Sequence, residues 1–160
     1  MIEMSLYENA RLLIDGKLVE ASGGRTFQNI NPATEEVIGL VPDASAEDAD
    51  RAFAAARRSF DLSDWSRNHE LRARCLRQLK DGLTERLEEL RKITVSEVGM
   101  PIQMTYGPGL DLYVGWLGDY ADHLEKFEWR VDAGVAEVMG NPAQRYVLRE
   151  PVGVMAAITP

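Results

Sequence analysis

Few side chains of this chain could act as a nucleophile or a general base, because its 160 residues include one cysteine and two histidines. Cys75 stands between Leu71 and Leu79 in a segment whose apolar residues recur at helical spacing. A reactive cysteine needs a polar site that stabilises the thiolate, and the apolar side of a helix does not provide one. We therefore expect Cys75 to be a small buried side chain.

The histidines and arginines give no catalytic pattern either. His69 and His123 have no partner at the spacing of a metal site or a catalytic triad, so we expect both to be surface residues. Arg72, Arg74 and Arg77 are expected on a solvated helix face. The stretch GPGLDL lacks the third glycine of a dinucleotide-binding turn. The sequence predicts no catalytic residue in this chain.

The composition limits the kinds of partner. The formal net charge is -8, and an acidic surface repels phosphate backbones, so we expect no nucleic-acid partner. The longest apolar run, residues 152–158, is too short to cross a bilayer, and we expect no membrane association. The first ten residues, MIEMSLYENA, do not resemble a signal peptide. A single cysteine suits the reducing cytoplasm, where we expect the protein.

Turn signals predict two β-hairpins near the N-terminus. Asp15 and Gly16 stand between two apolar runs, and glycine tolerates the positive φ that a type I′ turn requires. The sequence NPAT, residues 31–34, predicts a second turn, because proline presets φ for its first central position. Gly23 and Gly24 are expected to form the joint between the two hairpins.

The apolar spacing then changes to that of helices. Ser45 and Asp48 form a capping-box pattern at the start of the first helix. A second, longer helix is predicted over about residues 69–98, ended by Gly99 and Pro101. A third helix is predicted over about residues 110–127. Its expected buried face consists of Tyr113, Trp116, Leu117, Tyr120 and Leu124.

The C-terminal third of the chain has weaker signals. Residues 130–144 are interpreted as a loop with at most a short strand, and RYVLRE, residues 145–150, alternates like an exposed strand. The segment VGVMAAI, residues 152–158, is apolar on both faces, which is typical of a central strand of a parallel sheet. The chain offers this strand no βαβ partner, so we expect that further sequence completes its sheet.

INPATEEVIGLV, residues 30–41, and REPVGVMAAITP, residues 149–160, resemble the NAD(P)-dependent aldehyde dehydrogenase family. The resemblance extends from about Leu12 to Pro160 and keeps the order of the motifs. It implies an α/β fold and the N-terminal part of such an enzyme. The implied division is a tail at residues 1–10, the hairpins and helices of the cofactor-binding domain at 11–140, an oligomerisation arm at 141–150, and the truncated first strand of the dinucleotide-binding sheet at 151–160.

The resemblance also implies an activity for the complete enzyme. Members of the family oxidise an aldehyde to a carboxylate with NAD or NADP, through a thiohemiacetal on a cysteine. The family motif continues with Trp-Asn after Ile-x-Pro, and the glycine-rich turn, the glutamate base and the cysteine nucleophile follow later. We therefore expect this chain alone to be inactive and to bind little or no cofactor.

Site residues carried over from the family are few. Ile158, Thr159 and Pro160 would end the strand at the cofactor cleft, where they either contact the nicotinamide cofactor or only close the strand. Some members bind a monovalent cation; the matching residues are Asn29, Ile30 and Glu97, with Glu where the family has Asp. The 141–150 strand matches the arm that forms homo-oligomers, although a simple surface strand is the other reading.

A non-catalytic protein is the alternative to an enzyme fragment. The chain would then be a free-standing binding or oligomerisation module. The gene sequence after codon 160 separates the two hypotheses, because an in-frame Trp-Asn continuation favours the enzyme.

Overall fold

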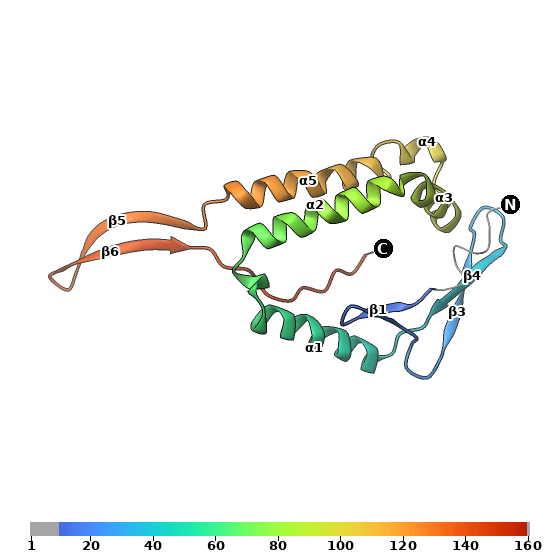
Figure 1. Ribbon diagram of the computed structural model, residues 1–160, viewed down its shortest axis with the longest axis horizontal. Coiled ribbons are helices and arrows are strands. Elements are labelled where there is room, and N and C mark those ends of the chain that lie inside the picture. Colours follow the sequence, from blue (N-terminus) through green and yellow to red (C-terminus); the bar gives the residue numbers. More distant parts are fainter. Residues whose placement is uncertain (1–9, 160) are drawn as a thin grey trace.

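The structure, a computed structural model, describes residues 10–159 of the chain. A pair of long helices lies above a third helix, one hairpin extends from the far end of this assembly, and two small hairpins lie at the other end (Figure 1). In chain order the elements are β1 (Leu12–Ile14), β2 (Lys17–Val19), β3 (Thr26–Ile30), β4 (Val37–Pro42), α1 (Ala46–Leu62), η2 (Asp64–Ser66), α2 (His69–Glu85), α3 (Leu87–Val98), α4 (Ile102–Thr105), α5 (Asp111–Lys126), β5 (Arg130–Val138) and β6 (Asn141–Leu148).

The two N-terminal hairpins form as the turn signals predict. β1 pairs with β2 in an antiparallel ladder, and the turn residues Asp15 and Gly16 have φ values of 55° and 71°. Positive φ at both central positions is the geometry of a type I′ turn, which matches the twist of the strands. β3 pairs with β4, and the Asn31 side chain accepts a hydrogen bond from the Ala33 N–H inside the turn. The two glycines lie in the joint between the hairpins, both with positive φ.

A buried carboxylate joins the first hairpin to α1. The predicted capping box is confirmed: the Ser45 hydroxyl accepts from the Asp48 N–H, and the Asp48 carboxylate accepts from the Ser45 N–H. Asp48 is 1% exposed and also accepts from the N–H and hydroxyl of Ser22, just after β2. The Ser45 N–H, with Ser22 and Arg51, holds the pKa of Asp48 well below its usual range.

The prediction of one continuous helix over residues 69–98 is wrong, because the segment forms two helices. It breaks at Arg86, which separates α2 from α3, and α3 turns away from the axis of α2 (Figure 1). The turn places Arg91 of α3, 4% exposed, where it donates to the Thr105 carbonyl and forms ion pairs with Glu88 and Asp111. A buried guanidinium needs such partners, so these contacts offset the loss of a continuous helix.

Helices α2 and α5 lie side by side along most of their length (Figure 1). Their contact is lined by small side chains: Ala73 and Ala121 are fully buried, and Val114 is 7% exposed. Small residues let two helix backbones approach closely, and the spacing of Val114 and Ala121 places them on one face. Gly118 faces the flexible side chain of Lys80, since an added Cβ would lie 3.2 Å from its ammonium nitrogen.

The predicted buried face of α5 is therefore wrong for its aromatic residues. Tyr113 is 55% exposed, Tyr120 is 56% exposed and Trp116 is 39% exposed. Leu117 and Leu124 are half-buried, as members of the packing face. Hydrophobicity alone placed the large side chains inside, whereas the close helix contact selects the small ones.

The predicted loop at residues 130–144 is also wrong, because most of it belongs to a long hairpin. β5 pairs antiparallel with β6 through a two-residue turn at Met139 and Gly140, which have φ values of 53° and 79°. A methionine at positive φ is unusual and gives no turn signal in the sequence. Gly134 has a φ of 74° where the register shifts between Asp132 and Val135. A bulge at such a position bends the ladder.

The segment predicted as a central strand, residues 152–158, forms no strand in the described part of the chain. Residues 151–159 instead run as an irregular extended segment past α1 and end between α1 and the α2/α5 pair (Figure 1). The difference arises because no neighbouring strand among the described residues pairs with its backbone N–H and C=O groups. Pro160 lies outside the described residues, as does nearly all of the expected tail at residues 1–10.

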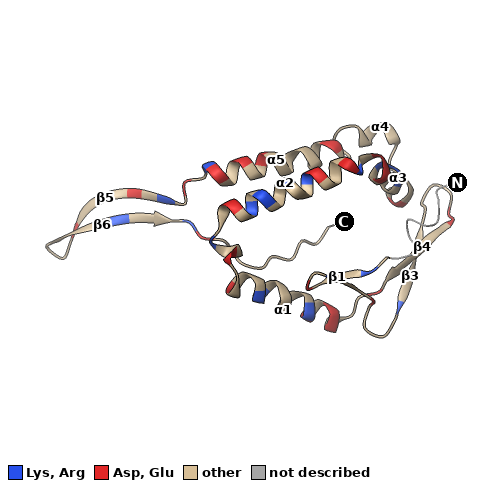
Figure 2. Cartoon of the chain, viewed as in Figure 1, with Lys and Arg blue, Asp and Glu red and all other residues tan. Residues whose placement is uncertain are grey.

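Charged residues lie along the three long helices, whereas residues 151–159 carry none (Figure 2). Among residues 10–159, no helix combines the length and the hydrophobicity needed to cross a bilayer.

Replacing Ala121 by leucine should destabilise the protein, because three further carbon atoms must fit into the closed contact between α2 and α5. We expect a loss of about 1–3 kcal/mol in the free energy of unfolding, measured by urea denaturation. The neighbouring Tyr120→Leu variant is the control, since this side chain is exposed and its replacement should change stability by about 0.5 kcal/mol or less. Equal losses in both variants would contradict the assigned packing face of α5.

Candidate functional site

Cys75 is half-buried on α2 rather than fully buried as expected. Its apolar stripe is only partly covered: Leu71 is half-buried, and Leu79 is 51% exposed. The thiol therefore occupies an apolar helix face at the margin of the packed region. An apolar setting of this kind does not stabilise the thiolate that a nucleophile needs.

The residues expected at a cofactor cleft are exposed. Ile158 is 94% exposed and Thr159 is also exposed, both in the irregular segment after β6, and Pro160 lies outside the described residues. Their contact with a cofactor stays a prediction.

The expected cation ligands come partly together. Asn29 of β3 donates its side-chain N–H to the Glu97 carboxylate of α3, at 2.7 Å, across 68 positions of the chain. Ile30 follows Asn29 where the β3–β4 register shifts. The hairpin also touches the end of α3, because a Cβ added to Gly99 would lie 2.9 Å from the Pro32 ring.

The chemistry of this place is suited to a cation in two respects. The carboxylate of Glu97 is an oxygen ligand, and the carboxyl end of a helix carries partial negative charge. In this structure, however, one Glu97 oxygen accepts directly from Asn29. No group of three or more His, Cys, Asp or Glu residues suited to a metal ion occurs among residues 10–159.

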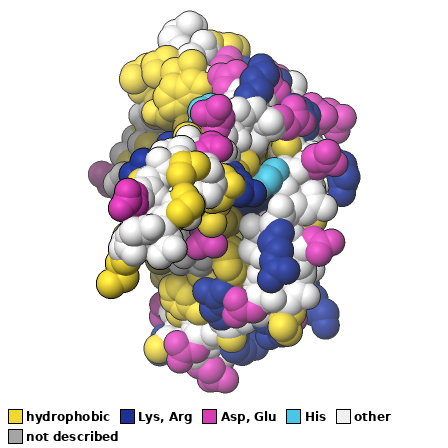
Figure 3. Space-filling view, turned by 90° about the vertical axis from the view of Figure 1, so that its left-hand side faces the viewer, with side chains coloured by type: hydrophobic (Ala, Val, Ile, Leu, Met, Phe, Trp, Pro, Cys, Tyr) yellow, Lys and Arg dark blue, Asp and Glu magenta, His cyan; other side chains and the backbone are white. Residues whose placement is uncertain are grey.

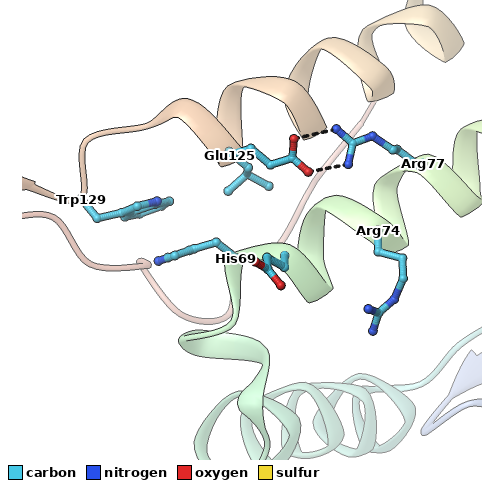
Figure 4. A pocket seen from close by; sticks show the side chains of 7 residues that line it. His69, Arg74, Arg77, Glu125 and Trp129 are labelled. Carbon is cyan, nitrogen blue, oxygen red and sulfur yellow. Dashed lines mark hydrogen bonds and ion pairs between the residues drawn. The ribbon is translucent and has the colours of Figure 1, made fainter.

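A hollow of about 520 Å³ lies between the start of α2, the end of α5 and the connection to β5 (Figure 4). It is lined by His69, Glu70, Arg74, Arg77, Leu124, Glu125 and Trp129. These side chains come from segments about 50 residues apart in the sequence, so the α2/α5 contact assembles the hollow.

Arg77 lies on a partly solvated helix face, with its side chain 40% exposed, and it also links the two long helices. It donates to both oxygens of Glu125, at 2.6 and 3.0 Å, and to Asp122 at 2.7 Å (Figure 4). These bonds, first of all that to Glu125, raise the pKa of Arg77 and lower those of Glu125 and Asp122. The paired charges lie at one wall of the hollow and are exposed, so we expect them to contribute little to stability beyond the helix contact itself.

The expectation that His69 is an ordinary surface residue is also wrong. Its ring stacks on Trp129 with centroids 4.1 Å apart and planes 6° apart. An Arg72 N–H reaches its Nδ1 atom, and the Arg72 guanidinium lies 5.3 Å from the centre of the Trp129 ring. Burial, and then the charge of Arg72, lower the pKa of His69. No sequence spacing signals this contact, because its partners are 60 residues apart.

Exposed apolar side chains gather on the β5–β6 hairpin, which points toward the viewer in Figure 3. Its large exposed hydrophobic residues are Val135, Val138, Met139, Tyr146, Val147 and Leu148. Met139 at the tip is 97% exposed. An apolar hairpin that projects from the helices is a candidate contact surface.

Sequence comparison finds relatives along nearly the whole chain. Residues 18–160 match the model of the aldehyde dehydrogenase family. The chain is 36% identical to the aminoacetaldehyde dehydrogenase of Pseudomonas aeruginosa over 94% of its length, and 34% identical to aldehyde dehydrogenase 1 of Tanacetum cinerariifolium over the same share. It spans 29% of the length of each of these relatives.

Solved structures agree with the sequence comparison. A Mycobacterium tuberculosis aldehyde dehydrogenase complexed with NAD+ matches 91% of this chain with a TM-score of 0.80 and 31% identity. A Staphylococcus aureus betaine aldehyde dehydrogenase in complex with NAD+ matches 93% with a TM-score of 0.81 and 28% identity. The chain covers 29% and 30% of those two chains, respectively.

Proposed function

The chain belongs to the aldehyde dehydrogenase family, and on that premise we propose that it forms the N-terminal part of an enzyme that oxidises an aldehyde to a carboxylate with a nicotinamide cofactor. The observation that carries the proposal is the match of residues 18–160 to the family. The agreement in fold with two NAD+-bound aldehyde dehydrogenases supports it. The cytoplasm is the proposed location.

The proposed contribution of this chain is structural rather than chemical. Cys75, its single thiol, is half-buried on the apolar stripe of α2, and such a setting does not stabilise a thiolate. The cysteine that attacks the aldehyde to form the thiohemiacetal would therefore belong to a different part of the enzyme. The chain on its own is then inactive.

The residues proposed to contact the cofactor are the last three of the chain. We propose that Ile158, Thr159 and Pro160 line the cleft for NAD or NADP once the 152–158 segment is paired in a sheet, because ligands of such sheets bind beyond the carboxyl ends of the strands. Phosphate binding needs the N–H groups of a helix that follows such a strand. Without it, the chain alone should bind little or no cofactor.

Asn29, Ile30 and Glu97 remain the proposed site for a monovalent cation. The contact between Asn29 and Glu97 supports this proposal, because it places a carboxylate beside the strand whose carbonyls would be the other ligands. Binding would require the Glu97 oxygen to exchange the Asn29 N–H for the ion.

We also propose that the chain associates with other subunits through β6, the second strand of the long hairpin. The Arg149 N–H donates to the Trp129 carbonyl at 2.9 Å, and bonded pairs alternate along an antiparallel ladder. Val131 and Val147 are therefore a bonded pair, and the N–H groups of Tyr146 and Leu148 point away from β5. This free edge supports pairing with another subunit. The same edge would serve a non-catalytic oligomerisation module, which is the alternative function.

The purified chain should not oxidise aldehydes, because it carries no activated nucleophile. Short-chain and aromatic aldehydes with NAD+ or NADP+ should give no sustained rise in the absorbance of the reduced cofactor. Replacing the corresponding segment of the P. aeruginosa relative by residues 18–160 should give an active chimera, since those residues share its fold. Sustained turnover by the isolated chain that is lost in Cys75→Ala would overturn the assignment, as would a folded chimera without activity.

Replacing Tyr146 by proline should weaken self-association, because proline removes an N–H from the free edge of β6 but none from its ladder with β5. The control is Tyr146→Thr, which removes the aromatic ring and keeps the N–H. Sedimentation velocity should show association for the unchanged chain and for Tyr146→Thr, and a shift toward monomer for Tyr146→Pro. Unchanged association of the proline variant would exclude pairing through this edge.

A further inference from the structure

The long hairpin is attached to the helices through a small cluster of aromatic and cationic side chains. We call His69, Arg72, Phe127, Trp129 and Arg149 the hairpin-root cluster. Phe127 meets Trp129 edge-on with centroids 4.7 Å apart, and Trp129 stacks on His69. The Arg149 guanidinium lies 5.4 Å from the centre of the Phe127 ring. The cluster thus joins the start of α2 to both strands of the hairpin.

The contact with Arg72 fixes the protonation state of His69 in this arrangement. A guanidinium has only N–H donors, so the Nδ1 atom that faces Arg72 must accept through its lone pair. This arrangement favours a neutral imidazole with its proton on Nε2. If Nδ1 also carried a proton, its N–H would face an N–H of Arg72, and the imidazolium and guanidinium charges would repel each other. His69 is also the first residue of α2, where the helix dipole disfavours a cation.

We propose that the hairpin-root cluster is a pH-sensitive joint, in which protonation of His69 breaks its contact with Arg72 and loosens the stack on Trp129. The hairpin is then held less firmly to the helix pair in mildly acidic solution. This inference does not depend on the enzymatic assignment, because it concerns only contacts within residues 69–149.

The charges around His69 favour its neutral form in the docked state. On α2, Arg72 touches it, and Glu70 and Arg74 line the same hollow. From α5, Glu125 faces the hollow, but Arg77 already neutralises it.

The remaining charged groups lie around the root of the hairpin. Arg149 donates to the Glu128 carbonyl, and His123 lies against Phe127 with centroids 5.4 Å apart. A protonated imidazole would gain some attraction from the Trp129 face, but the Arg72 cation already lies over that ring.

The direction of the pH effect follows from these contacts. Burial and Arg72 keep the pKa of His69 in the docked state below its ordinary value, about 6.5, to which it returns once the ring is exposed to water. The undocked state therefore binds more protons, and acid favours it. The stabilisation of the docked hairpin by neutral His69 is complete above about pH 6.5. It is lost as the pH falls through the pKa that His69 has in the docked state.

Nuclear magnetic resonance of the chain tests the proposal directly. At neutral pH the ¹⁵N shifts of His69 should identify Nδ1 as the unprotonated nitrogen. Its titration midpoint should be lower in the folded chain than in the chain unfolded by urea. The indole N–H signal of Trp129 and the amide signals of residues 130–148 should move with the same midpoint as His69.

Two variants provide the matched comparison. His69→Gln keeps an acceptor for Arg72 but does not titrate, so the Trp129 signal should become independent of pH. His123→Gln removes the other histidine and should leave the Trp129 transition in place. A Trp129 signal that stays constant in the unchanged chain, or a transition that survives in His69→Gln and disappears in His123→Gln, would overturn the proposal.

Discussion

Close packing of α2 against α5 is the constraint on which the other features of the molecule depend. Ala73 and Ala121 are fully buried in this contact, and a larger side chain at either place would force the helices apart. Because the small residues face inward, the aromatic residues of α5 face outward. The same contact places Arg77 opposite Glu125 and carries the end of α5 back to the start of α2. The hollow and the hairpin-root cluster both follow from this placement.

Apart from the contact between α2 and α5, the described chain has only a small hydrophobic core. The buried hydrophobic residues of the described chain are Ala21, Ala73, Val114 and Ala121, and three of them lie on the helix pair. The accessible surface is 12030 Å², whereas a compact monomer of 17.9 kDa has about 8,000 Å². The excess is larger than the area that one partner contributes to an obligate interface, about half of the roughly 2,000–5,000 Å² buried in total. Such a surface agrees with a chain that spans 29% of the length of its relatives.

Local signals predicted the parts of the fold that local geometry decides. The Asp15–Gly16 turn and the Ser45 capping box need only neighbouring residues, and both form as expected. The β5–β6 hairpin was missed because Met139 occupies a position that usually takes asparagine or glycine.

The candidate sites depend on contacts between distant segments, so the sequence revealed them poorly. The stack of His69 on Trp129 joins two segments 60 residues apart, and no spacing rule connects them. Asn29 and Glu97 were named together only as cation ligands implied by the family resemblance, and their direct hydrogen bond follows from no pattern in the sequence. The orientation of α5 was missed because hydrophobicity does not say which apolar residues are small enough for a close helix contact.

The central claim is that α2 and α5 form a closely packed pair, whereas the apolar segment at residues 152–159 has no strand partner. Native-state hydrogen exchange of the chain tests this claim most directly. The account predicts the slowest exchange for the amides of α2 and α5, near Ala73 and Ala121. It predicts exchange close to that of an unstructured peptide for residues 152–159, because these amides have no ladder partner in the structure. Protection of this segment equal to that of the helices would contradict the account, since the segment would then be paired and the chain would be a self-sufficient unit.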